Sequence, residues 1–213
     1  MEADAQGPVC ALALLPGQGS LAGEGAVTTQ LSLIPEVPTI EKRWPEVFPG
    51  IACNGAGFST DRRYRYWLSR KVDNPLTPLL QPIMWIMLNP SIADEKQLDP
   101  TLRRCMDFTR RIGGSVMLIG NLFALVSTDP RGLAAADDPV GQWNNSNIQA
   151  MAAFASTVVV GWGAHAKAAE RARTLCSLFI ADWKLHCLGT NHDGSPKHPL
   201  YLAKTAELVR WEP

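Results

Sequence analysis

Short hydrophobic runs alternate with segments of helical periodicity over most of the chain. Continuous apolar runs such as IMWIML and VMLI are typical of strands that are covered on both faces, and the aromatic-rich YRYWLS also has strand character. Less uniform runs near the carboxyl terminus indicate further strands. The predicted strands are residues 64–69, 83–88, 116–119, 157–160 and 183–188, with 206–211 as an additional candidate.

Three segments between these strands have apolar residues at helical spacing. Asp99 is a predicted N-cap with Pro100 at the first helical position, and we expect this helix to end at Gly113. The other two helices are predicted at 147–155 and 164–180. Because strands and helices alternate, we expect a three-layer α/β/α domain around a mainly parallel sheet of four to five strands.

The first 44 residues differ from the rest of the chain. They are rich in Gly, Ala, Pro, Thr and Ser and have no sustained period of a helix or a strand. This predicts a flexible N-terminal extension over 1–44 and a single α/β domain over 45–213. An alternative is that residues 26–34 pair with the domain as an added edge strand.

Composition narrows the possible functions. Twenty basic and 20 acidic residues give a formal net charge of zero, which argues against nucleic-acid binding by bulk charge but leaves room for a local basic patch. The five cysteines are scattered, so we expect a reducing cytoplasm and neither a disulfide framework nor a zinc ribbon. No apolar run is long enough to cross a bilayer and no secretory signal is indicated, so no membrane association is expected.

Several well-known catalytic motifs do not occur in the sequence. It contains no G-x-S-x-G, G-x-G-x-x-G or G-x-x-x-x-G-K-[ST] pattern, which excludes the usual triad hydrolases, dinucleotide enzymes and P-loop NTPases. The spacing of Cys187, His192 and His198 matches no strong metal-binding pattern. We therefore expect neither a cofactor nor a metal.

Distinctive polar residues follow directly after the predicted strands. Asn89, Asn121, the Trp162–His165 segment and the 191–198 segment each come after a different strand. Ligands bind at the carboxyl ends of the strands in sheets of this kind, so these residues are expected to share one rim. Asn side chains can contact an amide-like edge such as that of a nucleobase, and His can donate or carry a proton. An Asn-Pro pair is also a common turn at the end of a strand, and this structural interpretation stays open.

Five short motifs follow one another from residue 64 onward. They are YRY-x-L-x-R at 64–70, MLNPS-x-AD at 87–94, D-P-T-x-R-R-C at 99–105, NLFAL at 121–125 and HPLYL at 198–202. From about Phe58 to its carboxyl terminus, the chain resembles an uncharacterised and widely distributed microbial family, a domain of unknown function.

A more distant resemblance points to chemistry. The chain is similar to the uracil-DNA glycosylase superfamily at LNPS after the first core strand, at the strand ending in Asn121, at the strand running into Trp162–Gly163, and at the late His-Pro-Leu. The resemblance implies that Asn89 positions the attacking water, with Asp94 as a helper. It also implies that Asn121 binds the base edge, that His198 hydrogen-bonds the departing base, and that Leu200 fills the space of a flipped nucleotide. The remaining candidate ligand contacts are Pro90, Ser91, Phe123, Trp162 and His165.

This chain departs from the superfamily at two of these positions. Asn89 stands where the most active branches have Asp, so water would be positioned by the side chain and not activated by it. The sequence after His198 also departs from the usual H-P-S-P-L, which leaves open whether Leu200 inserts.

Two arginine-rich segments, 61–71 and 103–111, are candidate phosphate contacts. We expect Arg65, Arg70 and Arg103 to contact phosphates, although both segments also fit ordinary solvated faces. Two functions follow as hypotheses. One is a DNA glycosylase-like enzyme that hydrolyses the N-glycosidic bond of a damaged or modified base. The other is a non-catalytic module that binds a nucleotide, nucleobase or nucleic acid in the same pocket.

Overall fold

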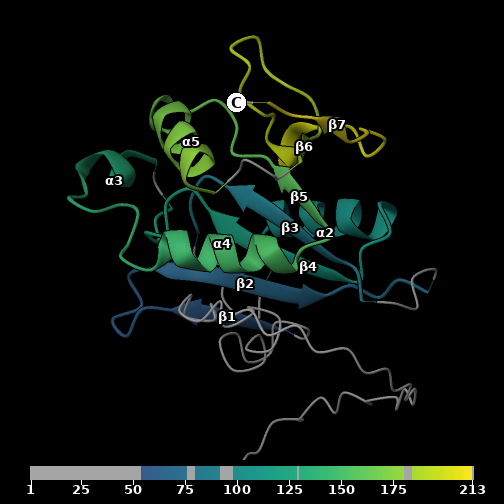
Figure 1. The fold of residues 1–213 in the computed structure, drawn as a ribbon, viewed down its shortest axis with the longest axis horizontal. Helices are drawn as coiled ribbons and strands as arrows, with labels where there is room; N and C mark the ends of the chain where they lie inside the picture. Colours follow the sequence, from purple (N-terminus) through teal and green to yellow (C-terminus); the bar gives the residue numbers. More distant parts are fainter. Residues whose placement is uncertain (1–53, 76–79, 92–97, 129, 180–183, 213) are drawn as a thin grey trace, which may run out of the picture. The chain divides into compact units, whose positions relative to one another are not determined.

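The computed structural model describes residues 54–75, 80–91, 98–128, 130–179 and 184–212. The predicted N-terminal extension and Asp94 lie outside these residues. A seven-stranded sheet forms the centre of the fold, in the order β1-β2-β4-β3-β5-β6-β7 (Figure 1). The strands are β1 Gly55–Phe58, β2 Arg65–Lys71, β3 Pro82–Met87, β4 Val116–Asn121, β5 Thr157–Val160, β6 Leu185–Cys187 and β7 Val209–Arg210. The helices are α2 Pro100–Arg111, α3 Pro130–Ala135, α4 Asn144–Phe154, α5 Ala166–Phe179 and the 3₁₀ helix η2 Pro199–Tyr201.

The sheet is mixed, which corrects part of the sequence-based prediction. Strands β4, β3, β5 and β6 run parallel, whereas β1 and β2 at one edge and β7 at the other pair antiparallel with their neighbours. The α/β class is confirmed, but the sheet has seven strands instead of four to five. Strand β1 was missed because its sequence, GAGF, contains neither an apolar run nor a clear alternation.

Two hydrophobic clusters cover the two faces of the sheet. Helix α2 places Leu102, Cys105 and Phe108 against one face, and the buried Trp85 Nε1 donates to Thr109 Oγ1 of this helix at 2.9 Å. Helices α4 and α5 pack on the other face, where α4 lies in front of the strands in Figure 1. The parallel strands are therefore apolar on both sides, as their continuous hydrophobic runs predicted.

The sequence signals at the start of α2 are confirmed. Asp99 is the N-cap, its side chain accepts a hydrogen bond from the Leu102 backbone, and Pro100 occupies the first turn. No helix in the described part of the chain is both long enough and apolar enough to span a bilayer.

A β-bulge interrupts the start of β2. On β1, Gly57 is opposite Trp67 whereas Phe58 is opposite Arg65, so Tyr66 is an extra residue without a partner on β1. Tyr66 and Trp67 consequently both belong to the cluster on the α4 side, and Arg65 shares the α2 side with Leu68. Bulges commonly redirect a side chain in this way. Here the bulge turns a buried arginine toward the carboxyl end of β4.

Candidate ligand-binding cavity

A small polar cavity lies at the carboxyl ends of β3, β4 and β5. We call it the inner cavity; its volume is about 160 Å³. Four of the residues that the sequence placed on a common rim meet here: Asn89, Asn121, Trp162 and His198. The complete lining is Arg65, Met87, Leu88, Asn89, Ser91, Asp99, Thr101, Leu102, Ile119, Asn121, Trp162 and His198.

Asn121 carries an unsatisfied amide into this cavity. It is the last residue of β4 and only 1% exposed, and its Nδ2 has no hydrogen-bond partner among the described residues. Its backbone carbonyl, in contrast, accepts a bond of 3.0 Å from Asn144 Nδ2, so the strand end is firmly held. Buried polar groups are almost always hydrogen-bonded, because an unpaired one costs about 1–3 kcal/mol. The side chain is therefore a donor prepared for a ligand atom that accepts a hydrogen bond.

Asn89 follows β3 and has its amide oriented by the backbone. Its Nδ2 donates to the carbonyl oxygens of Ser127, at 2.8 Å, and Pro90, at 3.1 Å. Oδ1 is then the acceptor that Asn89 can offer inside the cavity. The residue thus holds the turn after β3, as the structural interpretation expected, and also lines the cavity.

Asp99 is a cavity residue that the sequence identified only as a helix cap. Its Oδ2 accepts a hydrogen bond of 2.6 Å from Ser91 Oγ, and its Oδ1 accepts one of 2.7 Å from the Leu102 backbone. The signal that could have revealed it is an acidic N-cap eight residues after Ser91 of the LNPS segment. Asp99 is the only carboxylate in the lining described.

Arg65 brings a positive charge to the same cavity. The side chain is 2% exposed, and burial lowers its pKa to about 10, an effect that the nearby Asp99 carboxylate opposes and that Arg70 reinforces. The guanidinium is still protonated at neutral pH. The cavity therefore combines a buried cation and a carboxylate with neutral polar and apolar side chains.

His198 serves as the N-cap of η2. Its Nδ1 accepts a hydrogen bond from the Leu200 backbone at 3.3 Å, which assigns the proton of the neutral ring to Nε2. Burial lowers the pKa of His198 below its ordinary value, although the Asp99 charge opposes this shift. At neutral pH His198 therefore presents an N–H donor.

A second, more open cavity adjoins the inner one. This outer groove of about 460 Å³ shares Trp162 and His198 with the inner cavity and also includes Lys197 and Tyr201. Trp162 is buried and its ring packs edge-on against Trp211, with ring centroids 5.2 Å apart. A ligand in the inner cavity could thus extend past these two side chains into the groove.

Several residues that the sequence proposed for the site do not line the inner cavity. Phe123 is packed in the core on the α4 side, and His165 Nδ1 accepts a hydrogen bond from the Lys167 backbone near the start of α5. Pro90 is buried beside Asn89, and its carbonyl accepts from the Ser127 backbone. Leu200 lies next to His198 in η2 but is not in the lining. These four residues therefore do not contribute to the inner cavity.

The three arginines that were predicted to contact phosphates lie in different environments. Arg103 is exposed on α2, whereas Arg70 is buried and its Nη1 donates to the carbonyl oxygens of Gly55 and Ser69. Arg65 is buried and lines the inner cavity. Within the described ranges, no three His, Cys, Asp or Glu side chains form a group that could hold a metal ion.

Fold and site together define an α/β protein with a small polar cavity at the carboxyl ends of its parallel strands. The chain belongs to the family described as Protein of unknown function (DUF1643), which matches residues 65–200. This confirms the expectation of an uncharacterised family, and the matched span contains every residue of the inner cavity lining. No curated protein and no solved structure matches the chain.

Proposed function

We propose that the inner cavity binds a single-ring nucleobase and that the protein hydrolyses the N-glycosidic bond of a damaged or modified base in DNA. The observation that carries the proposal is the buried Asn121 amide, which lacks a partner where a ligand would supply one. A flat ring with a carbonyl oxygen would accept hydrogen bonds from Asn121 Nδ2 and from His198 Nε2.

The size of the cavity supports a small ring. Its volume of about 160 Å³ is close to that of a protein cavity of about 150 Å³ that holds benzene. Helices on both faces of the sheet are also consistent with the fold of the uracil-DNA glycosylase superfamily, which the sequence distantly resembles.

Different side chains of the cavity lining act in different parts of the proposed reaction. As the bond from the sugar C1′ to the base nitrogen breaks, its electron pair moves onto the base, and His198 Nε2–H stabilises that charge. The water oxygen forms the new bond to C1′ while Asn89 Oδ1 orients the water by accepting one hydrogen bond. The water proton ends on the departing base, and Asp99 is the lining carboxylate that can carry it.

The test is a base-release assay with purified protein. Duplexes carrying uracil, mismatched bases or hypermodified bases are incubated with the protein, and abasic sites are detected by alkaline strand cleavage. We expect strand cleavage at one class of base. The Asn89→Ala variant should lose most of this cleavage. The matched control is Asn147→Ala, because Asn147 lies on α4 and its amide donates to the Trp143 carbonyl, away from the cavity lining.

A second candidate is a binding module that uses the same cavity without turnover. The observation that favours it is the commitment of Asn89 Nδ2 to two backbone carbonyls, which is what a purely structural turn residue would show. If wild type and Asn89→Ala are equally inert on every duplex while nucleobases still raise the melting temperature, this candidate replaces the enzyme.

A further inference from the structure

A third concave region lies on the other face of β2, apart from the inner cavity and the outer groove. Phe58, Tyr64, Tyr66 and Trp143 line it together with Asp61 and Asp138, and its volume is about 580 Å³. We call it the aromatic depression. The proposed function does not use it, and the inference below does not depend on that function.

The β2 bulge also creates this depression. Because Tyr66 is the extra residue, it turns to the α4 side and stacks on Tyr64, with ring centroids 6.2 Å apart and planes 7° from parallel. Trp143, at the N-cap of α4, lines the same depression and is 56% exposed. Tyr66 itself is buried, so the accessible aromatic surface consists of the exposed Trp143 and the half-buried Tyr64 and Phe58.

In each carboxylate at the rim, one oxygen accepts hydrogen bonds from the chain and the other is available to a ligand. Asp61 Oδ1 accepts from Ser59 Oγ at 2.6 Å and from the Arg63 backbone at 3.1 Å, and these bonds lower the pKa of Asp61. Asp138 Oδ1 likewise accepts from the backbones of Val140 and Gly141. In neither carboxylate does Oδ2 bond to a described residue. Two fixed negative charges thus flank the aromatic rings.

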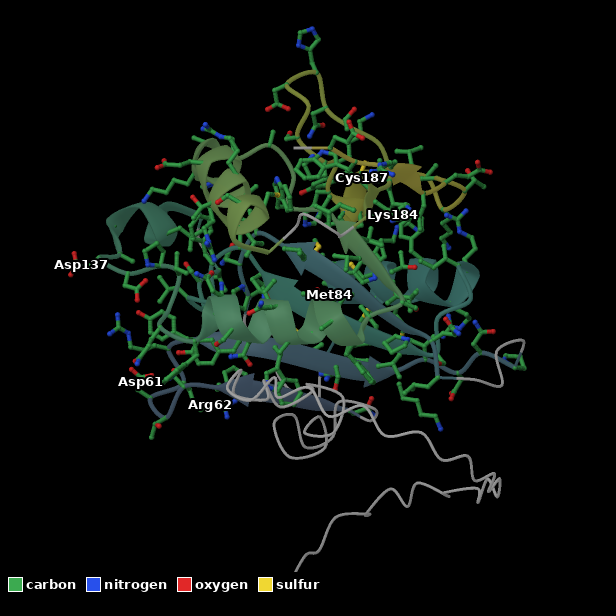
Figure 2. All side chains as sticks on the ribbon, in the orientation of Figure 1. Asp61, Arg62, Met84, Asp137, Lys184 and Cys187 are labelled. Carbon is green, nitrogen blue, oxygen red and sulfur yellow. The ribbon has the colours of Figure 1, made fainter. Side chains whose placement is uncertain are left out.

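The chain itself shows which group these rings accept. The Arg62 guanidinium lies 4.0 Å from the centre of the Phe58 ring, and that of Arg63 lies 5.8 Å from the centre of the Tyr64 ring. Figure 2 shows Asp61 and Arg62 projecting from the turn that leads from β1 to β2. Aromatic faces attract cations, and the planar guanidinium also stacks on them.

We propose that the aromatic depression binds an arginine side chain of a partner peptide, which stacks on the exposed Trp143 and pairs with Asp61 and Asp138. The guanidinium would donate to the two Oδ2 atoms while its plane covers an aromatic face. Lysine would bind less well, because an ammonium group is neither planar nor forked.

The test is a titration of the full chain with a short arginine peptide, followed by NMR of the Trp143 indole N–H. The signal is assigned by its loss in Trp143→Phe. We expect a saturable shift with the arginine peptide and binding at least five-fold weaker for the same peptide with citrulline, its neutral isostere. The double variant Asp61→Asn and Asp138→Asn should lower the affinity about ten-fold, since two exposed ion pairs are removed. Asparagine can accept the same turn hydrogen bonds, so the fold is retained.

Asp193→Asn is the matched control. Asp193 Oδ1 accepts a hydrogen bond from the Ser195 backbone in the same kind of turn, but Asp193 does not line the aromatic depression. Its replacement should therefore leave the affinity for the peptide unchanged. Equal binding of the citrulline peptide, or an equal loss in Asp193→Asn, would overturn the proposal. So would an oligonucleotide that shifts the Trp143 signal and binds more tightly to the double variant, because that result assigns the depression to nucleic acid. Asn121→Leu should not affect the titration.

Discussion

Replacing Asn121 with leucine is expected to stabilise the fold and to abolish recognition in the inner cavity. Asn121 is 1% exposed and its Nδ2 has no described partner, so the wild-type protein carries the cost of a buried, unpaired donor. This cost is about 1–3 kcal/mol, and leucine has a similar shape without the polar atoms. The inner cavity can accept the slightly larger side chain. We therefore expect a gain of about 1–2 kcal/mol in the free energy of unfolding, or roughly 2–8 °C in melting temperature.

Asn144→Leu is the matched control for this measurement. Asn144 is equally buried, and although its Oδ1 has no partner among the described residues, its Nδ2 donates to the backbone carbonyls of Asn121 and Leu122, at 3.0 and 3.1 Å. The same substitution should therefore destabilise the protein by about 1–3 kcal/mol. Both variants are compared with wild type by urea denaturation followed by circular dichroism. If Asn121→Leu destabilises the protein as much as Asn144→Leu does, the Asn121 amide is satisfied in the free protein and the argument for a ligand donor fails.

Three further predictions follow from particular contacts. Asp99→Ala should cost about 1 kcal/mol of stability through loss of the α2 cap, whereas Asp99→Asn should keep most of it; equal urea midpoints for the two variants would contradict the capping role. Burial lowers the pKa of His198, so the unfolded chain binds more protons than the folded one, and stability present at pH 7 should fall as the pH drops through the unfolded value of 6.5. His198→Asn, which can still cap η2, should flatten that part of the pH profile in thermal melts, and an unchanged profile would refute the assignment. Gly57→Ala should lower the free energy of unfolding by about 1–3 kcal/mol, because the added Cβ would lie 2.0 Å from Trp67 Nε1. Unchanged thermal melts would mean that the indole moves freely.

The sequence alone determined the elements whose signals are local. Continuous apolar runs predicted β3, β4 and β5, and an acidic residue before proline predicted the start of α2 at Asp99. The alternation of these elements implied a rim at the strand ends, and Asn89, Asn121, Trp162 and His198 do meet there. This inference succeeded because the carboxyl ends of neighbouring parallel strands necessarily lie at one edge of a sheet.

Only the tertiary structure decided strand direction at the sheet edges and the direction of individual side chains. The antiparallel pairing of β1, β2 and β7 depends on long-range hydrogen bonds that no local pattern encodes. One extra residue at Tyr66 reverses the face that Arg65 occupies, since a shift of a single position moves a strand residue to the other side of the sheet. That bulge supplies the inner cavity with its cation and the aromatic depression with its stacked tyrosines, and the sequence YRYW shows neither outcome.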